Sequence, residues 1–127
     1  MPDKEQYEYA VIRIVPQVER EEFLNVGVVL FCAKHKFLQC RYHLNEERVL
    51  ALSPELDLVE MKQHLHSFEQ ICAGNAEGGP IARLGIAERF RWLTATRSTV
   101  LQTSKVHPGL CANPGSMLDR IYAQQVS

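Results

Sequence analysis

The chain has 127 residues, of which 46% are apolar and 23% are charged, and its formal net charge is −1. This length and composition predict one soluble globular domain over residues 1–127, large enough to bury a core without metals or crosslinks. Because domains that bind duplex nucleic acid carry a clear positive excess, the near-neutral charge argues against nucleic acid as a partner. No apolar run approaches the roughly 20 residues that span a bilayer, so no membrane partner is expected either.

The N-terminal stretch and the cysteines indicate a cytoplasmic location. Residues 1–6 are charged and lack the apolar segment of a secretion signal, and we expect them to be frayed. The cysteines show no CxxC pairing, which favours reduced and mostly buried thiols. They are Cys32, Cys40, Cys72 and Cys111.

The first predicted strand covers residues 7–15. This stretch is rich in aromatic and β-branched residues and stops at Pro16, which cannot continue a ladder. It is apolar on both faces except at Glu8 and Arg13, which predicts a central place in a sheet. The polar residues 17–22 then connect it to the next strand.

The most apolar run, residues 22–33, predicts the strand around which the rest of the chain is organised. Side chains alternate between the two faces of a strand. One face is therefore wholly apolar and comprises Leu24, Val26, Val28, Leu30 and Cys32. The opposite face comprises Phe23, Asn25, Gly27, Val29 and Phe31. Since Asn25 and Gly27 are poor strand formers that lie side by side on this face, they predict a notch with a polar rim.

A hairpin and a long helix are predicted next. The polar tip at residues 34–36 separates the second strand from a third over residues 37–44, and residues 45–52 are expected to form a loop with a helical turn. Ser53 and Pro54 combine an N-cap with a proline at the first helical position, which predicts a helix start. This helix should carry an apolar stripe and end at a C′ glycine, with the pattern Leu58, Met61, Leu65, Phe68, Cys72 and Gly74.

A flexible connector over residues 74–80 precedes a second predicted helix over residues 81–93, which carries Leu84, Ala87, Phe90 and Trp92 or Leu93 on one face. On a helix, Phe90 and Trp92 cannot both face the core. One of them is therefore an exposed binding anchor, unless both pack at the end of the helix.

The last third of the chain predicts an edge strand over residues 98–105 and a loop over residues 107–113. Asn113 and Pro114 repeat the cap-then-proline signal and begin a closing amphipathic helix. Its apolar residues are Met117, Leu118, Ile121, Tyr122 and Val126. Because the strands precede most helices, the order favours an α+β fold. We expect a small antiparallel sheet, built on the N-terminal strand and hairpin and packed by two or three helices.

Two groups of residues together carry a resemblance to a known family. The N-terminal group is Tyr9-Ala10-Val11-Ile12-Arg13 with Pro16, followed by Arg20, Glu22, Phe23 and Asn25-Val26-Gly27-Val28-Val29-Leu30. The C-terminal group is Arg97, Ser98, Leu101, Gln102 and Leu118-Asp119-Arg120-Ile121-Tyr122. With these residues, nearly the whole chain resembles the bacterial domain-of-unknown-function family numbered 3037. The resemblance implies no assigned activity, and it favours an accessory role beside a kinase-like protein encoded nearby.

The candidate binding site is a set of polar residues and one glycine around the first two strands: Arg13, Arg20, Glu22, Asn25, Gly27 and Arg97. If these strands pair, Arg13 and Asn25 could share a face with the Gly27 notch, where a ligand or another backbone can approach closely. Arginine offers a planar fork for phosphate or carboxylate, and asparagine offers both a donor and an acceptor. The alternative is structural: Glu22 pairs with an arginine, while Asn25 and Gly27 form a bulge or strand crossing.

The spacing Cys32-x-x-His35 and Cys40-x-x-His43 superficially suits a zinc site. Residues three apart on a strand point to opposite faces, however, so the hairpin cannot gather these side chains without distortion. We therefore expect no metal.

No other motif identifies a catalytic residue. Cys111 lies near His107 in sequence, but no nucleophile elbow accompanies this pair. Gly78-Gly79-Pro80 lacks the lysine of a P-loop and the spacing of a dinucleotide fingerprint. We expect no cofactor.

These observations favour a cytoplasmic binding or accessory module that regulates or assists a partner protein, with the arginines and Asn25 on the recognised surface. The alternative is a small enzyme, or a nucleotide- or phosphate-binding protein, that uses Arg13, Glu22, Asn25 and Arg97. A catalytic site would gather these groups in a concave pocket, whereas a binding module would leave them flat beside an exposed apolar patch. The sequence leaves homo-oligomerisation open.

Overall fold

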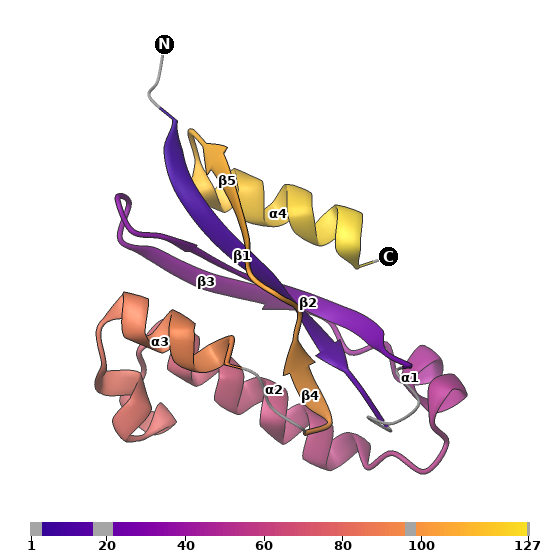
Figure 1. Cartoon of the computed structure of the whole chain (residues 1–127). Helices are drawn as coiled ribbons and strands as arrows, with labels where there is room; N and C mark the ends of the chain where they lie inside the picture. Colours follow the sequence, from indigo (N-terminus) through magenta and orange to yellow (C-terminus); the bar gives the residue numbers. More distant parts are fainter. Residues whose placement is uncertain (1–3, 17–21, 96–98, 127) are drawn as a thin grey trace.

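The computed structural model describes residues 4–16, 22–95 and 99–126. Within these residues the chain forms a five-stranded antiparallel sheet and four α-helices (Figure 1). The α+β fold expected from the order of the elements is confirmed. In the described part of the chain, no helix is both long enough and apolar enough to cross a membrane.

Strand β1 (Glu5–Ile14) lies at the centre of the sheet, as its two apolar faces predict. On one side it pairs with β2 (Leu24–Cys32), which in turn pairs with β3 (Phe37–Tyr42). On the other side its two ends have different partners: β5 (His107–Cys111) pairs with its first half, and β4 (Leu101–Thr103) pairs with its last residues. The chain therefore covers the second edge of β1 with two short strands rather than one.

The strand β5 corrects the prediction of a loop over residues 107–113. Pro108 and Gly109 are poor strand formers, but the backbone of a central strand needs hydrogen-bond partners on both edges. Gly109 faces Tyr7 across the ladder, and a Cβ there would lie 2.5 Å from the Tyr7 ring. Pairing with β1 thus decides the conformation, and glycine permits it.

The same ladder extends β1 toward its N-terminal end. Glu5 pairs with Cys111 and Gln6 pairs with Leu110, so both residues belong to the sheet instead of a frayed end. Lys4 precedes the strand.

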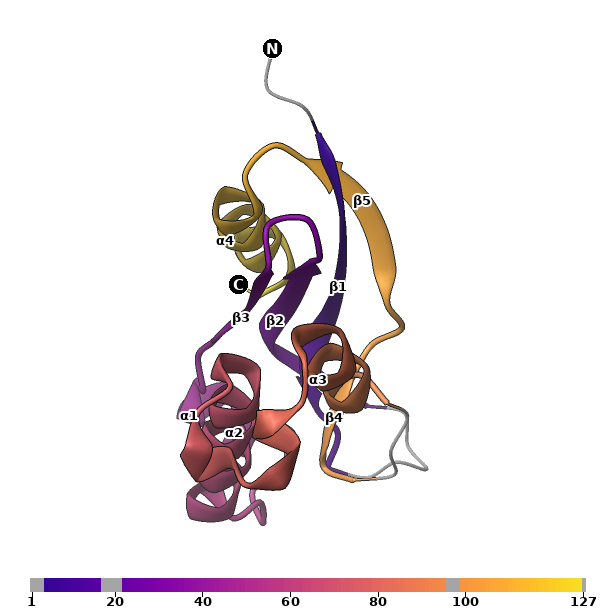
Figure 2. The same cartoon turned by 90° about the vertical axis from the view of Figure 1, so that its left-hand side faces the viewer.

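Helices cover both faces of the sheet (Figures 1 and 2). The helices α1 (Glu46–Leu52), α2 (Leu58–Ala73) and α3 (Ile86–Leu93) enclose the larger core on one face. The helix α4 (Pro114–Gln125) encloses a smaller core on the other. Two short 3₁₀ helices, η2 (Ala76–Gly78) and η3 (Pro80–Arg83), connect α2 to α3. Every residue of β2 from Val26 to Cys32 is buried because both faces are covered.

The starts of the helices show which capping signals the fold uses. Asn113 caps α4 as predicted, and its side chain accepts a hydrogen bond from the Ser116 N–H at 3.1 Å. For α2 the prediction was wrong: Asp57 is the N-cap, and its side chain accepts from the Glu60 N–H at 3.1 Å. Ser53 instead ends α1, which forms a full helix where a loop with a helical turn was expected.

The rest of the α2 prediction is confirmed. Four members of the apolar stripe are buried, and Leu58 packs against them at the edge of the core; the four are Met61, Leu65, Phe68 and Cys72. Gly74 ends the helix with φ of +71°, a left-handed conformation that glycine adopts without strain.

A β-bulge at Val26 overturns the predicted division of β2 into two faces. The register passes from Ile12 opposite Gly27 to Arg13 opposite Asn25, so Val26 has no partner across the ladder. An extra residue shifts the alternation of every side chain beyond it. Residues 28, 30 and 32 therefore face α4, whereas Leu24 and Val26 pack into the core beneath the other helices.

Candidate functional site

The bulge brings Arg13 and Asn25 directly opposite each other at one end of the β1–β2 ladder. Asn25 lies on the α4 face, where its Nδ2 donates to the main-chain oxygen of Gln125 at 3.2 Å. The predicted proximity of Arg13 and Asn25 is therefore present in the fold. We call Arg13, Asn25 and the neighbouring Phe23 the β1–β2 end surface.

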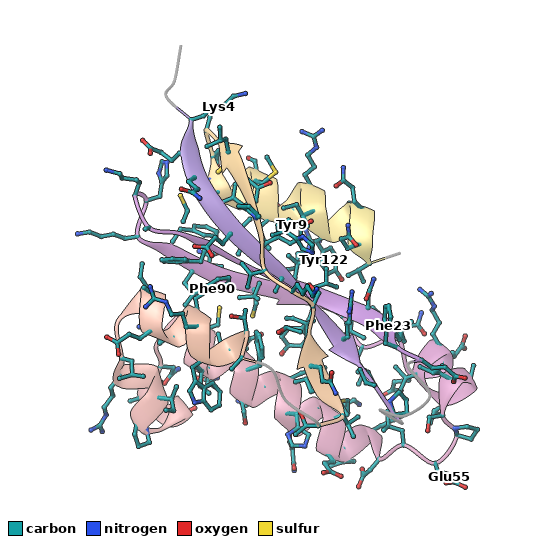
Figure 3. The ribbon with its side chains drawn as sticks, viewed as in Figure 1. Lys4, Tyr9, Phe23, Glu55, Phe90 and Tyr122 are labelled. Atoms are coloured by element: carbon teal, nitrogen blue, oxygen red, sulfur yellow. The ribbon has the colours of Figure 1, made fainter. Side chains whose placement is uncertain are left out.

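Phe23 makes this surface partly apolar. The Cζ atom of Arg13 lies 4.2 Å from the centre of the Phe23 ring, in cation–π geometry. The Phe23 side chain is nonetheless 48% exposed, the greatest exposure among the described aromatic residues. Figure 3 labels this side chain, which lies just before the start of β2. The guanidinium thus holds in place an aromatic ring that the core does not cover.

Two buried atoms of this surface lack hydrogen-bond partners among the described residues: Nε of Arg13 and Oδ1 of Asn25. A buried polar atom left unpaired costs about 1–3 kcal/mol. Apart from its contact with Phe23, the Arg13 guanidinium has no hydrogen bond or ion pair within the part of the chain that the structure describes. Its donors are therefore not used by the described residues.

Gly27 does not share the face of Asn25. Because of the bulge, Gly27 lies on the opposite face of the sheet. Within the sheet its neighbour is β3, where its Cα is paired with that of Tyr42. A Cβ at Gly27 would lie 2.6 Å from the Tyr42 Cβ and 2.6 Å from the Arg41 main-chain oxygen. The polar-rimmed notch predicted from Asn25 and Gly27 is therefore not formed, since the chain itself occupies the space beside the glycine.

The remaining members of the predicted set are Glu22, which directly precedes Phe23, and two arginines that the structure does not describe. Glu22 is exposed and comes two residues before β2 begins. Arg20 and Arg97 lie outside the described residues. Of the four predicted residues that the structure describes, Arg13 and Asn25 are paired with each other across the ladder.

Sequence reasoning missed a second arginine–aromatic contact on the α4 face. The Cζ atom of Arg41 lies 4.5 Å from the centre of the Tyr122 ring, and the same guanidinium bonds the Asp119 carboxylate at 2.8 Å. Tyr122 also borders the small pocket beside Asn25. The signal that could have placed Arg41 on this face is the alternation of residue types in β3, where Gln39 and Arg41 alternate with Leu38, Cys40 and Tyr42.

The pocket beside Asn25 is small. Its volume is about 120 Å³, and its polar lining residues are Asn25, His43, Asn45 and Arg48. Sites for small organic ligands usually measure about 300–1,000 Å³. Arg13 does not line the pocket. The concave arrangement expected of an enzyme that uses Arg13 and Asn25 together is not present there.

The cysteines form two neighbouring pairs on opposite sides of the sheet. Cys32 packs with Cys111 beneath α4, whereas Cys40 lies beside Cys72 of α2. The pKa of the Cys72 thiol is raised by hydrogen bonding to Cys40 and by burial. Burial, together with Cys32, raises the pKa of the Cys111 thiol. Both groups are therefore protonated and unreactive at neutral pH.

Within the described residues, the cysteine and histidine side chains that suggested a metal site or a nucleophile do not come together. Cys32 and Cys40 face opposite sides of the sheet, and no group of three His, Cys, Asp or Glu side chains there lies close enough to hold a metal ion. His107 and Cys111 stand four residues apart on β5, a separation of about 13 Å along a strand.

Comparisons with known proteins agree with the resemblance noted in the sequence. No curated protein and no solved structure matches this chain. The model of a family described as "Protein of unknown function (DUF3037)" matches residues 9–126, which include the β1–β2 end surface and all four α-helices. The chain therefore belongs to the family DUF3037.

Proposed function

We propose that this chain is a cytoplasmic accessory module that binds a partner protein through the β1–β2 end surface. The observation that carries the proposal is the exposed ring of Phe23, held 4.2 Å beneath a guanidinium with no other partner in the described chain. Arginine and aromatic residues are enriched among the few residues that dominate protein interfaces. The surface offers both kinds in one place.

The chemistry of this surface also defines the partner. Arg13 can offer several parallel N–H donors, which suit a carboxylate, and Phe23 offers an apolar surface beside them. We expect the partner to present an acidic side chain next to an apolar one. A kinase-like protein encoded nearby is a candidate that the family resemblance suggests.

The competing function is a small enzyme or a phosphate-ligand-binding protein. It is less well supported, because Arg13 and Phe23 line none of the pockets described for this fold and the pocket beside Asn25 measures only about 120 Å³. That volume holds a few water molecules or a small anion, and not a nucleotide.

The test is purification of the tagged protein at native expression level, with mass spectrometry of the proteins that co-purify. We expect one stoichiometric partner, retained by the wild type and lost on Arg13→Ala or Phe23→Ala. Arg83→Ala is the matched control, because Arg83 is an exposed arginine on η3, among the helices of the larger core. Thermal unfolding of each variant establishes that partner loss is not loss of folding.

Two results would overturn the proposal. One is recovery of the protein alone under gentle salt conditions. The other is a partner that Arg13→Ala and Phe23→Ala retain as well as the wild type does. Stabilisation of the protein by nucleotides or phosphate, abolished by Arg13→Ala, would favour the competing function instead.

A further inference from the structure

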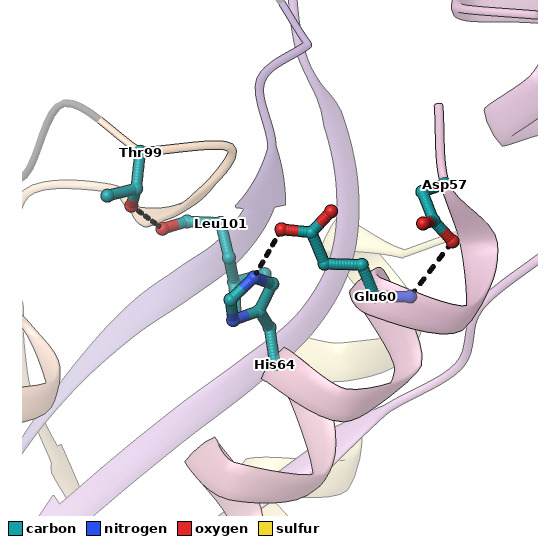
Figure 4. A network of polar contacts seen from close by, with 5 residues as sticks. All are labelled: Asp57, Glu60, His64, Thr99 and Leu101. Carbon is teal, nitrogen blue, oxygen red and sulfur yellow. Dashed lines mark hydrogen bonds and ion pairs between the residues drawn. The ribbon is translucent and has the colours of Figure 1, made fainter. Parts of the chain in front are cut away.

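The largest pocket described lies away from the β1–β2 end surface, between α2, α3 and β4. Its volume is about 470 Å³, within the range of about 300–1,000 Å³ found for small-molecule sites. We call it the Trp92 pocket and define it by Glu60, His64, Ser67, Phe68, Trp92 and Leu101. Figure 4 shows the contact between Glu60 and His64 on α2, together with Thr99 and Leu101, which line the same pocket.

The floor and one wall of the pocket are apolar. Phe68 and the neighbouring Ile71 come from the buried face of α2, and Leu101 of β4 is half-buried. Trp92 forms the other wall and is 38% exposed, although Phe90 and Leu93 of the same helix are buried. This confirms that α3 buries only one of its two aromatic residues, and the exposed one stands at a pocket rather than on a flat face.

The rim of the pocket has a defined charge. The Glu60 carboxylate lies 3.4 Å from Nε2 of His64, one helical turn away. The pair carries a charge of −1 when the imidazole is neutral and of zero when it is protonated. No lysine or arginine is found among the described residues that line the pocket. Among these described lining residues, the charged group that a ligand would meet is the Glu60 carboxylate, which attracts a cation.

We propose that the Trp92 pocket binds a small hydrophobic amine. The ammonium group would pair with the Glu60 carboxylate at the rim, and the apolar body would lie between Trp92 and Phe68. Ser67, exposed and two helical turns beyond Glu60 on α2, adds a hydroxyl to the lining of the same pocket. This site is independent of the proposed partner surface, so either proposal can fail without the other.

The composition of the chain supplies a direct readout. Trp92 is the only tryptophan in the sequence, so intrinsic tryptophan fluorescence reports on this pocket alone. The probes are three compounds that share a phenylethyl body: 2-phenylethylamine, 2-phenylethanol and 3-phenylpropionate. They present a cationic, a neutral and an anionic group respectively to the rim.

We expect a saturable change in the emission of the wild type with the amine, weaker binding of the alcohol and the weakest binding of the carboxylate. Glu60→Gln should weaken amine binding by about 1.4-fold to fivefold, the range expected for a solvent-exposed ion pair, and should leave alcohol binding unchanged. The matched control is Glu55→Gln, an exposed carboxylate outside the pocket, which should change neither.

A second variant tests the cavity itself. Ser67→Phe adds bulk at an exposed position on the rim, so the fold should tolerate it while the pocket is filled. Amine binding should then be lost in a protein with wild-type unfolding behaviour. The proposal is overturned if the amine gives no saturable change, if the three probes bind equally, or if Ser67→Phe binds the amine as the wild type does.

Discussion

Gly27 and Tyr42 are paired across β2 and β3 at a distance that no side chain on Gly27 would allow. A Cβ added to Gly27 would lie 2.6 Å from the Tyr42 Cβ, closer than van der Waals contact permits. The glycine in the middle of an apolar strand is thus explained by the approach of the neighbouring strand. It adjoins the bulge at Val26, which turns Asn25 toward α4.

Gly27→Ala should therefore destabilise the fold by about 1–3 kcal/mol, the usual cost of forcing extra atoms into a packed interior. Urea unfolding followed by circular dichroism measures this difference. Gly115→Ala on α4 is the matched control, because a Cβ there meets nothing closer than 3.4 Å and alanine favours a helix. If Gly27→Ala unfolds at the same urea concentration as the wild type, the close approach of β3 is wrong.

The break between β4 and β5 leads to a prediction about Ser104. The Val11 N–H donates to Oγ of Ser104 at 2.9 Å, at the point where β1 changes partner from β5 to β4. Ser104→Ala would leave this N–H unpaired inside the sheet, at a cost of about 1–3 kcal/mol.

Thermal or urea unfolding of Ser104→Ala tests this, with Ser116→Ala, an exposed serine of α4, as the control. The control should unfold as the wild type does. Equal stability of the two variants would contradict a structural role for the Ser104 hydroxyl.

Tyr42 should make stability depend on alkaline pH. Burial, followed by hydrogen bonding to the Glu69 side chain, raises the pKa of Tyr42 to about 12 from its ordinary value of 10.0. The unfolded state therefore loses its proton at lower pH than the folded state does. The contribution of the neutral phenol is complete below pH 10 and is lost as the pH rises through about 12.

The measurement is the free energy of unfolding between pH 9 and pH 12 for the wild type and for Tyr42→Phe, a window set by the two pKa values of this group. The wild type should lose more stability over this window than the variant, since other groups titrate in both proteins. Parallel curves for the two proteins would show that Tyr42 ionises equally easily in the folded and unfolded states.

Cys72 and Cys111 should be unreactive in the native protein. The raised pKa values of Cys72 and Cys111 leave little thiolate at neutral pH, and both side chains are buried. Iodoacetamide should alkylate them far more slowly in the folded protein than in urea, whereas the half-buried Cys40 should react sooner. Peptide mass spectrometry over a time course resolves the sites, and native alkylation of Cys72 as fast as that of Cys40 would refute the expectation.

The sequence alone determined the helices and strands that are specified by residue patterns within a single segment. The stripe on α2 and its glycine stop, the asparagine cap of α4, the β2–β3 hairpin and the central place of β1 all follow from patterns within one segment. These patterns act through neighbouring turns of a helix or through the period of a strand. They do not depend on what a distant segment does.

Only the tertiary structure decided the features that rest on pairing between distant segments. One extra residue in the β1–β2 ladder moved Asn25 and Gly27 to opposite faces, and the need of β1 for a second neighbour made a strand of residues 107–111. The local propensity of a segment predicts neither the register of a ladder nor which strand pairs with a free edge. Both are decided by backbone pairing between distant segments, which outweighs local propensity. The candidate surface of Arg13, Phe23 and Asn25 was therefore predictable only in part. The sequence suggested Arg13 and Asn25 as binding residues, and the tertiary structure determined that they lie together with Phe23.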